Sequence, residues 1–207
     1  MRSSTKRWRR WTYGGIMAIL GIGITGGLLY MVVRGGGSLP VTGQAPGMSG
    51  TDLAGKTVSI SQLDGKVRLV TWFYTHCPDE CPLTAYQMKT LQQQLEQRGQ
   101  FGTKVAFVSM TLDPRRDTLP VIRKWAGHFD ANPAGWYFLR AEPADTTAIL
   151  QNWGVGKKAS TNPEFIEHVV KTELIDQNGN IRKVYPTANL NTTEVMNDIQ
   201  NLVSRGS

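Results

Sequence analysis

Two cysteines, Cys77 and Cys81, are the residues best suited to do chemistry in this sequence. They are its only cysteines, and they stand in the segment THCPDECP at residues 75–82. Thiolates are nucleophiles and also soft metal ligands. Residues four apart on a helical turn have Cβ atoms about 5–6 Å apart, a separation that small adjustments make compatible with a disulfide. The pair can therefore form a disulfide or hold one ion.

The surroundings of the pair favour metal capture over rapid thiol attack. The segment follows an apolar run typical of a buried strand and precedes a helical pattern, and such a loop faces the crevice where open α/β sheets bind ligands. The N–H groups of a helix N-terminus stabilise thiolates. The neighbouring Asp79 and Glu80 are expected to raise the thiol pKa values by like charge and to attract a cation.

Two simpler interpretations of the pair are less favourable. A purely stabilising disulfide would close a very short loop and contribute about 2 kcal/mol or less. A structural zinc site needs four ligands, and the sequence has no second pair of cysteines. Cu(I) accepts two or three ligands, for which thiolates and an imidazole are suitable.

Three histidines could supply the imidazole. His76 adjoins Cys77, but neighbouring side chains point apart, which favours an exposed loop residue. His128 suits the C-terminus of a surface helix. His168 lies where a loop enters a strand, and it can approach the cysteines if that strand lies beside residues 67–74. From spacing alone, a structural role explains His168 at least as well.

The pattern of apolar residues predicts one α/β domain. Strands alternate with helices, and a hairpin and a final helix follow, so we expect parallel central strands with an antiparallel end. The turn Gln-Asn-Gly at 177–179 predicts the hairpin, and Asn191 with Glu194 has the spacing of a helix capping box. The expected strands are 67–74, 105–112, 136–139, 169–176 and 180–185, and the expected helices are 83–95, 119–129, 144–153 and 191–203.

The N-terminal part predicts a membrane anchor. Residues 13–33 are 21 uncharged positions, and a helix of that length spans about 31 Å, which matches a bilayer core. Residues 1–12 are basic, which places them in the cytoplasm. We therefore expect a transmembrane helix at 13–34, a flexible Gly/Ser/Pro-rich linker at 35–52, and a folded domain at 53–207 on the outer face of the cell membrane. A cleaved signal peptide is disfavoured, because the apolar stretch is long and no small-x-small site follows it.

The charge distribution argues against nucleic-acid binding. The net charge is +7, but residues 1–34 hold six basic and no acidic residues, which leaves 17 basic against 16 acidic residues in the remainder. The excess positive charge lies beside the apolar stretch, where it is explained by the orientation of a membrane anchor and not by a nucleic-acid-binding surface.

Three motifs together resemble the Sco/SenC family. They are THCPDECP at 75–82, LDPRRDT at 112–118, and His168 followed by LIDQNG at 174–179. The resemblance runs from about residue 53 to 203. It implies a thioredoxin-like fold, with a mixed central sheet flanked by helices, and a role in assembling the dinuclear copper centre of cytochrome c oxidase.

The resemblance also implies the ligands and the partners. It implies that Cys77, Cys81 and His168 are the copper ligands. Cu(I) is the expected ion, and Cu(II) stays open as an alternative. The partners it implies are the copper-site subunit of the oxidase, together with other copper chaperones or thiol reductants.

The second motif has a structural and a functional interpretation. An Asp-Pro step after a strand is typical of a turn, and Asp117 or Thr118 could cap the following helix. Asp113 ends the second buried strand, and its carboxylate could orient His168 or stabilise a bound cation. Asp113 is therefore a candidate for a residue that supports the metal site without binding the metal itself.

Four functions compete at this stage, and the sequence does not decide whether the protein is an enzyme. The first is copper delivery, and the second is a thiol-disulfide reductase that keeps the oxidase cysteines reduced. The C-x-x-x-C spacing differs from the C-x-x-C of thioredoxin-type enzymes and favours the first. A scaffolding module would leave two cysteines at a crevice unexplained.

The fourth function, a thiol peroxidase, fits poorly. Peroxiredoxins resemble P-x-x-x-T-x-x-C around the reactive cysteine. For Cys77 the Pro and Thr positions hold Val70 and Tyr74, and for Cys81 they hold Tyr74 and Pro78.

Overall fold

The computed structural model describes residues 38–159, 166–168, 171–186 and 189–206. Residues Leu39–Ser207 form one compact unit. The predicted basic segment at 1–12 and the predicted anchor at 13–34 lie outside the described residues. Within the described ranges, each helix is too short or too polar to cross a bilayer.

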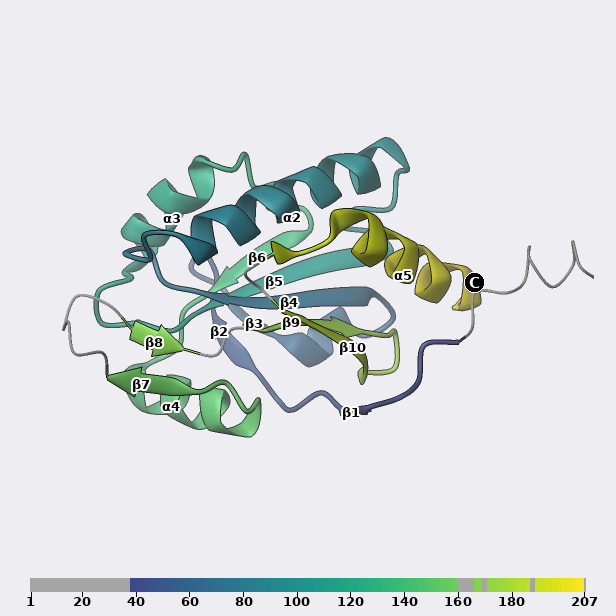
Figure 1. The fold of residues 1–207 in the computed structure, drawn as a ribbon. Coiled ribbons are helices and arrows are strands. Elements are labelled where there is room, and N and C mark those ends of the chain that lie inside the picture. The colour runs from purple at the N-terminus through teal and green to yellow at the C-terminus, as the bar shows by residue number, and fades with distance from the viewer. Residues whose placement is uncertain (1–37, 160–165, 169–170, 187–188, 207) are drawn as a thin grey trace, which may run out of the picture. The chain divides into compact units, whose positions relative to one another are not determined.

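A mixed sheet forms the centre of the unit (Figure 1). In the described part of the chain, this sheet has six strands in the order β1-β10-β9-β4-β5-β6. The neighbours β4, β5 and β6 are parallel, whereas β9 runs antiparallel to β4, so the predicted α/β class is confirmed. The strands are β1 (Gly43–Gln44), β4 (Val67–Phe73), β5 (Val105–Thr111), β6 (Trp136–Leu139), β9 (Lys171–Ile175) and β10 (Asn180–Pro186).

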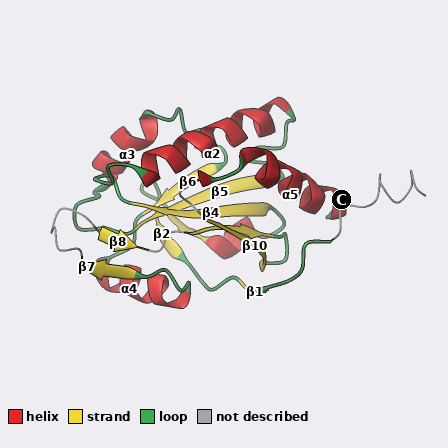
Figure 2. Ribbon diagram, in the orientation of Figure 1, coloured by secondary structure: helices red, strands yellow, loops and turns green. Residues whose placement is uncertain are grey.

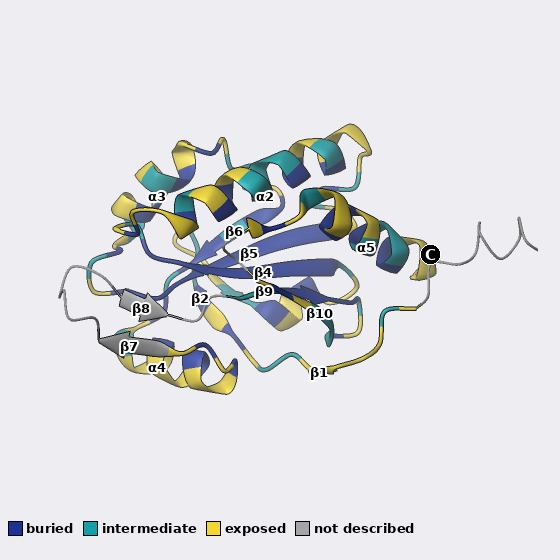
Figure 3. Ribbon diagram, in the orientation of Figure 1, coloured by how far each residue is buried: buried dark blue, intermediate teal, exposed yellow. Residues whose placement is uncertain are grey.

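Helices cover both faces of the sheet (Figure 2). Helices α2, α3 and α5 lie on one face, and α4 lies on the other. Every residue of β4 and β5 is buried, as expected for strands covered on both sides, and Figure 3 shows them at the centre of the core. The helices are α2 (Glu80–Gln97), α3 (Leu119–Gly127), α4 (Pro143–Asn152) and α5 (Thr192–Arg205), with a short 3-10 helix at Ile60–Leu63.

Local sequence explains where the helices pack and begin. In α2, Cys81, Ala85, Met88 and Leu95 are among the buried residues, at spacings that place them on one helical stripe. In α5, the Asn191 side chain accepts a hydrogen bond from the backbone N–H of Glu194 at 3.1 Å. The predicted N-terminal cap of this helix is therefore confirmed.

Two short hairpins were not predicted. Strand β2 (Ser49–Thr51) pairs with β3 (Thr57–Ser59), and β7 (Lys157–Ala159) pairs with β8 (Ile166–His168). The first hairpin also joins the end of β6, through a bridge between Thr51 and Arg140. Three-residue strands carry too little periodicity to be distinguished from loops.

The predicted linker at 35–52 extends too far into the folded domain. Strands β1 and β2 lie within it, and the Met48 side chain is only 3% exposed. At Gly50, an added Cβ would lie 3.0 Å from the carbonyl oxygen of Arg140, so glycine here permits a close approach of two backbones. Gly50 is thus one of the glycines that made this segment resemble a linker, although the packing of the segment against Arg140 requires it.

Candidate functional site

Both cysteines lie where β4 gives way to α2. Cys77 is in the connecting loop, and Cys81 is in the first turn of the helix, which begins at Glu80 instead of at residue 83. Both thiols are free, and the two residues are 8% and 2% exposed. The backbone N–H of Cys81 points at the Cys77 sulfur at 3.3 Å. The helix N-terminus thus faces the Cys77 sulfur, as the sequence predicts.

The two thiols have opposite acidities. A hydrogen bond from the Cys81 thiol, helped by the backbone N–H groups of Asp79 and Cys81, outweighs burial and lowers the pKa of Cys77 to about 5. The same hydrogen bond, together with burial, raises the pKa of Cys81. At neutral pH the pair is therefore one thiolate hydrogen-bonded to one thiol. The expected like-charge effect of the adjacent acids is present at Cys81, where Glu80 adds to the rise in pKa, but at Cys77 the hydrogen bonds decide the direction.

We expect the reduced protein to titrate one thiol with an apparent pKa near 5. Ultraviolet absorbance of the thiolate, followed against pH, measures this, and Cys77→Ser should remove the step. Because the folded pKa is lower than the ordinary value of 9.0, the stability contributed by Cys77 is complete above about pH 9 and disappears as pH falls through about 5. A first thiolate appearing only near pH 9 would contradict this assignment.

The buried carboxylate of Asp117 ties the cysteine loop to the end of β5. It accepts the Thr75 backbone N–H at 3.2 Å and the hydroxyl groups of Thr75 and Thr111 at 2.5 Å each. Burial raises the pKa of Asp117. The helix-capping role considered for Asp117 and Thr118 is wrong, because Thr118 occupies the N-cap of α3 without a side-chain cap. The sequence missed this contact because it joins two loops 42 residues apart.

Asp113, the candidate for assisting the site, lies two residues after the end of β5 and is 8% exposed. Its carboxylate forms an ion pair with Arg116, and its backbone N–H donates to Thr111. To assist a bound cation, the carboxylate would have to share or exchange the guanidinium of Arg116. Its role toward His168 stays a prediction.

His76 and His128 are both exposed, in agreement with the roles expected of them. His168 ends β8, where its Cα pairs with Lys157. Its side chain lies outside what the structure describes. Among the described residues, no three His, Cys, Asp or Glu side chains are grouped to hold a metal ion.

The backbone nevertheless meets the condition set for His168. Strand β9 pairs antiparallel with β4, with Val70 opposite Glu173. Because the two strands run in opposite directions, β9 begins at the sheet edge where β4 ends and the cysteine loop follows. His168 is three residues before Lys171, the first residue of β9, a reach of at most about 11 Å. The ligand role of His168 remains a prediction.

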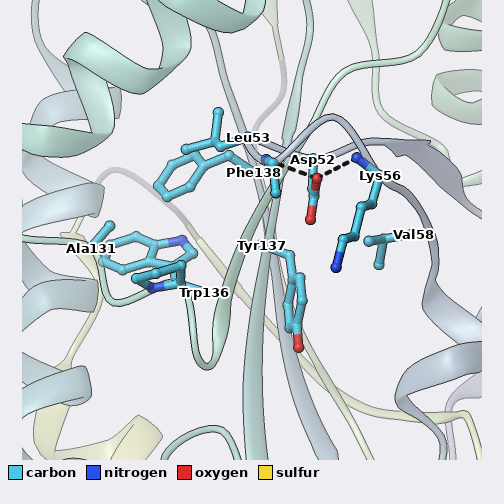
Figure 4. A pocket seen from close by; sticks show the side chains of 10 residues that line it. Asp52, Leu53, Lys56, Val58, Ala131, Trp136, Tyr137 and Phe138 are labelled. Carbon is cyan, nitrogen blue, oxygen red and sulfur yellow. Dashed lines mark hydrogen bonds between the residues drawn. The ribbon is translucent and has the colours of Figure 1, made fainter.

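Among the described residues, two of the hollows that lie away from the cysteine pair border the β2–β3 turn and the loop after β5. One, of about 350 Å³, is lined by residues around the start of β6 and the β2–β3 turn; in it the Asp52 carboxylate accepts the backbone N–H groups of Ala54 and Lys56 (Figure 4). The other, of about 590 Å³, lies between the loop at residues 112–115 and the first turns of α4. Neither is lined by a cysteine.

Comparison with known proteins gives a consistent result. The family model described as SCO1/SenC matches residues 47–204. The SCO1 protein homolog of Bacillus subtilis is 25% identical over 170 residues, covering 79% of this chain and 86% of the relative.

Solved structures share the fold. A SCO1/SenC family lipoprotein from Bacillus anthracis superimposes with a TM-score of 0.70 at 24% identity, covering 79% of this chain and 96% of that chain. Bradyrhizobium japonicum ScoI, whose structure has copper bound, superimposes with a TM-score of 0.65 at 23% identity, covering 77% and 99%. These likenesses confirm the predicted fold, a mixed sheet between helices.

Proposed function

Because the chain belongs to the SCO1/SenC family, we propose that it binds copper through Cys77, Cys81 and His168 and delivers it to the dinuclear copper centre of cytochrome c oxidase. The observation that carries this proposal is the pair of free, buried cysteines at the start of α2, one in the preceding loop and one in the first turn of the helix. Two soft sulfur donors at the start of one helix suit Cu(I), and a neutral imidazole completes a three-ligand set.

The charges of the site allow both binding and release. Cys77 is already a thiolate at neutral pH, whereas Cys81 must lose its proton as the copper cargo binds. Two thiolates with Cu(I) carry one net negative charge, which the helix N-terminus stabilises. Returning the proton to Cys81 favours release, so that copper passes by ligand exchange to the cysteines and histidines of an oxidase subunit.

We expect the reduced full chain to bind one Cu(I). His168→Ala should lower the affinity by at least about 10-fold, because losing one of three ligands costs no less than losing a residue that only orients a ligand. His128→Ala, at an exposed histidine, is the matched control and should bind as the wild type does. Competition with a coloured Cu(I) chelator measures all three. An unchanged affinity in His168→Ala would dismiss His168 as a ligand.

Oxidation of the cysteine pair tests the shared site. A disulfide is a poor copper donor, so the verified oxidised protein should bind no Cu(I). Copper retained at one ion per chain after oxidation would refute the proposal that both sulfurs hold it.

Thiol-disulfide reduction is the second candidate function, and one observation favours it. The lowered pKa of Cys77 makes it a nucleophile that could attack a disulfide of the oxidase subunit to form a mixed disulfide. Cys81 must then attack Cys77 to release the target with both its sulfurs reduced, and the raised pKa of Cys81 slows that step. The C-x-x-x-C spacing, which differs from the C-x-x-C of thioredoxin-type enzymes, favours copper delivery over this second function.

Rescue of a deletion strain separates the two functions. Restored oxidase activity on adding copper supports delivery, and restoration by a reductant alone supports the reductase.

We also propose that residues 13–34 anchor the protein in the cell membrane with the folded domain on the extracytoplasmic face. The support is the uncharged stretch of 21 residues preceded by basic residues.

A further inference from the structure

A buried carboxylate on β9 has no part in the functions proposed so far. Glu173 is 0% exposed. Its Oε1 lies 2.8 Å from the Lys171 ammonium, and its Oε2 accepts the indole N–H of Trp72 at 3.4 Å. Lys171 precedes Glu173 on the same face of β9, and Trp72 comes from β4, five residues before Cys77. The carboxylate thus joins the strand that leads to the cysteines with the strand that follows His168.

Both ends of the β7–β8 hairpin meet at this carboxylate and its partners. One end leaves α4 through Trp153 and Gly154, and the Trp153 ring packs edge-on against Trp72 at 5.6 Å between centroids. A Cβ added to Gly154 would lie 3.8 Å from the Lys171 ammonium. On the other side, Lys171 itself is three residues after His168, the last residue of β8. The residues that flank the hairpin on its two sides therefore both lie beside Glu173 and its partners.

Stability alone does not account for a carboxylate in this place. Burial raises the pKa of Glu173 more than Lys171 and Trp72 lower it. Burial therefore works against the charged form of Glu173, and the stability of the folded protein rises as pH falls through the pKa of this group. Buried ion pairs are often replaced by apolar residues without loss of stability. We therefore look for a role of the Glu173 carboxylate other than stabilising the fold.

We propose that Glu173 is a positioning residue for His168. Its ion pair with Lys171 and its contact with Trp72 fix the two ends of the β7–β8 hairpin, so that His168 is presented to the cysteine loop. This inference rests on the proposed function, because it matters only if His168 is a ligand.

A double-mutant cycle on the full chain tests the inference. Glu173→Gln keeps the side-chain volume and removes the charge, and we expect about a tenfold loss of Cu(I) affinity, the lower end of the range for residues that orient metal ligands. In the His168→Ala background, the same change should cost nothing further, since there is no imidazole to position. Glu194→Gln is the matched control, at a half-exposed glutamate paired with Lys183, and should bind as the wild type does.

A readout without copper keeps the two proposals separate. In Glu173→Gln, the amides of Lys157–Ala159 and Ile166–His168 should exchange hydrogen faster, while those of β4 and β5 keep their wild-type rates. An unchanged affinity, or the same loss in both backgrounds, would overturn the positioning role and leave the proposed function intact. A wild-type chain that binds no Cu(I) would contradict the proposed function. In that case the hydrogen-exchange rates of the β7–β8 amides alone show whether Glu173 holds the hairpin in place.

Discussion

Cys81→Ser is expected to weaken Cu(I) binding by more than about 100-fold, beyond the loss typical of residues that only orient a ligand. Serine can still donate a hydrogen bond to the Cys77 sulfur, so the Cys77 thiolate should persist and keep its lowered pKa. What disappears is the second soft donor, and a hydroxyl is a poor ligand for Cu(I). Competition with a Cu(I) chelator measures the loss.

The variant needs a control that changes the same helix without removing sulfur. Thr84→Ser is suitable, because Thr84 is buried one turn after the site and its hydroxyl bonds to the Glu80 carbonyl, a contact that serine retains. We expect it to bind copper as the wild type does. Wild-type affinity in Cys81→Ser would show that Cys81 is no ligand and that the pair serves thiol chemistry.

Asp117→Ala is expected to lower the free energy of unfolding by about 3 kcal/mol or more. The change leaves the N–H and hydroxyl of the half-buried Thr75 and the hydroxyl of the buried Thr111 without this acceptor, and each unsatisfied buried group costs about 1–3 kcal/mol. Urea unfolding measures the loss. Because Thr75 opens the cysteine segment, copper affinity should fall as well.

Two companion variants show whether the loss comes from these hydrogen bonds. Asp117→Asn keeps one acceptor oxygen and the volume, and it should cost less than alanine. Glu142→Ala removes an ion pair with Arg140 in which the glutamate side chain is 72% exposed, so it should change stability by at most about 1 kcal/mol. An Asp117→Ala protein as stable as Glu142→Ala would mean that the carboxylate does not hold the loop.

The strands of the sheet could be predicted because their apolar runs are local signals. Residues 67–74, 105–112 and 136–139 agree with β4, β5 and β6 to within about one residue. The ends of α2 were less predictable. The helix begins at Glu80, three residues before the predicted start. The prediction missed its first turn because that turn carries part of the cysteine segment, whose residues do not follow the apolar stripe of the helix.

The prediction failed for segments whose structure depends on contacts with residues far away in the sequence. Residues 43–51 resemble a linker in composition, but they pair with β10 and β3 and bury Met48. The β7–β8 hairpin is likewise too short to show a pattern. In both cases the stabilising contacts come from elsewhere in the chain, so that no local window contains the signal.

The sequence by itself determined the cysteine pair at the end of a strand, the α/β class and the likeness to one family, because spacing, apolar periodicity and motifs are properties of neighbouring residues. Only the tertiary structure decided that Cys77 is the thiolate and Cys81 the thiol, that Asp117 holds Thr75, and that β9 lies beside β4. These features depend on burial and on hydrogen bonds between atoms far apart in the chain, and such contacts exist only once the strands have paired.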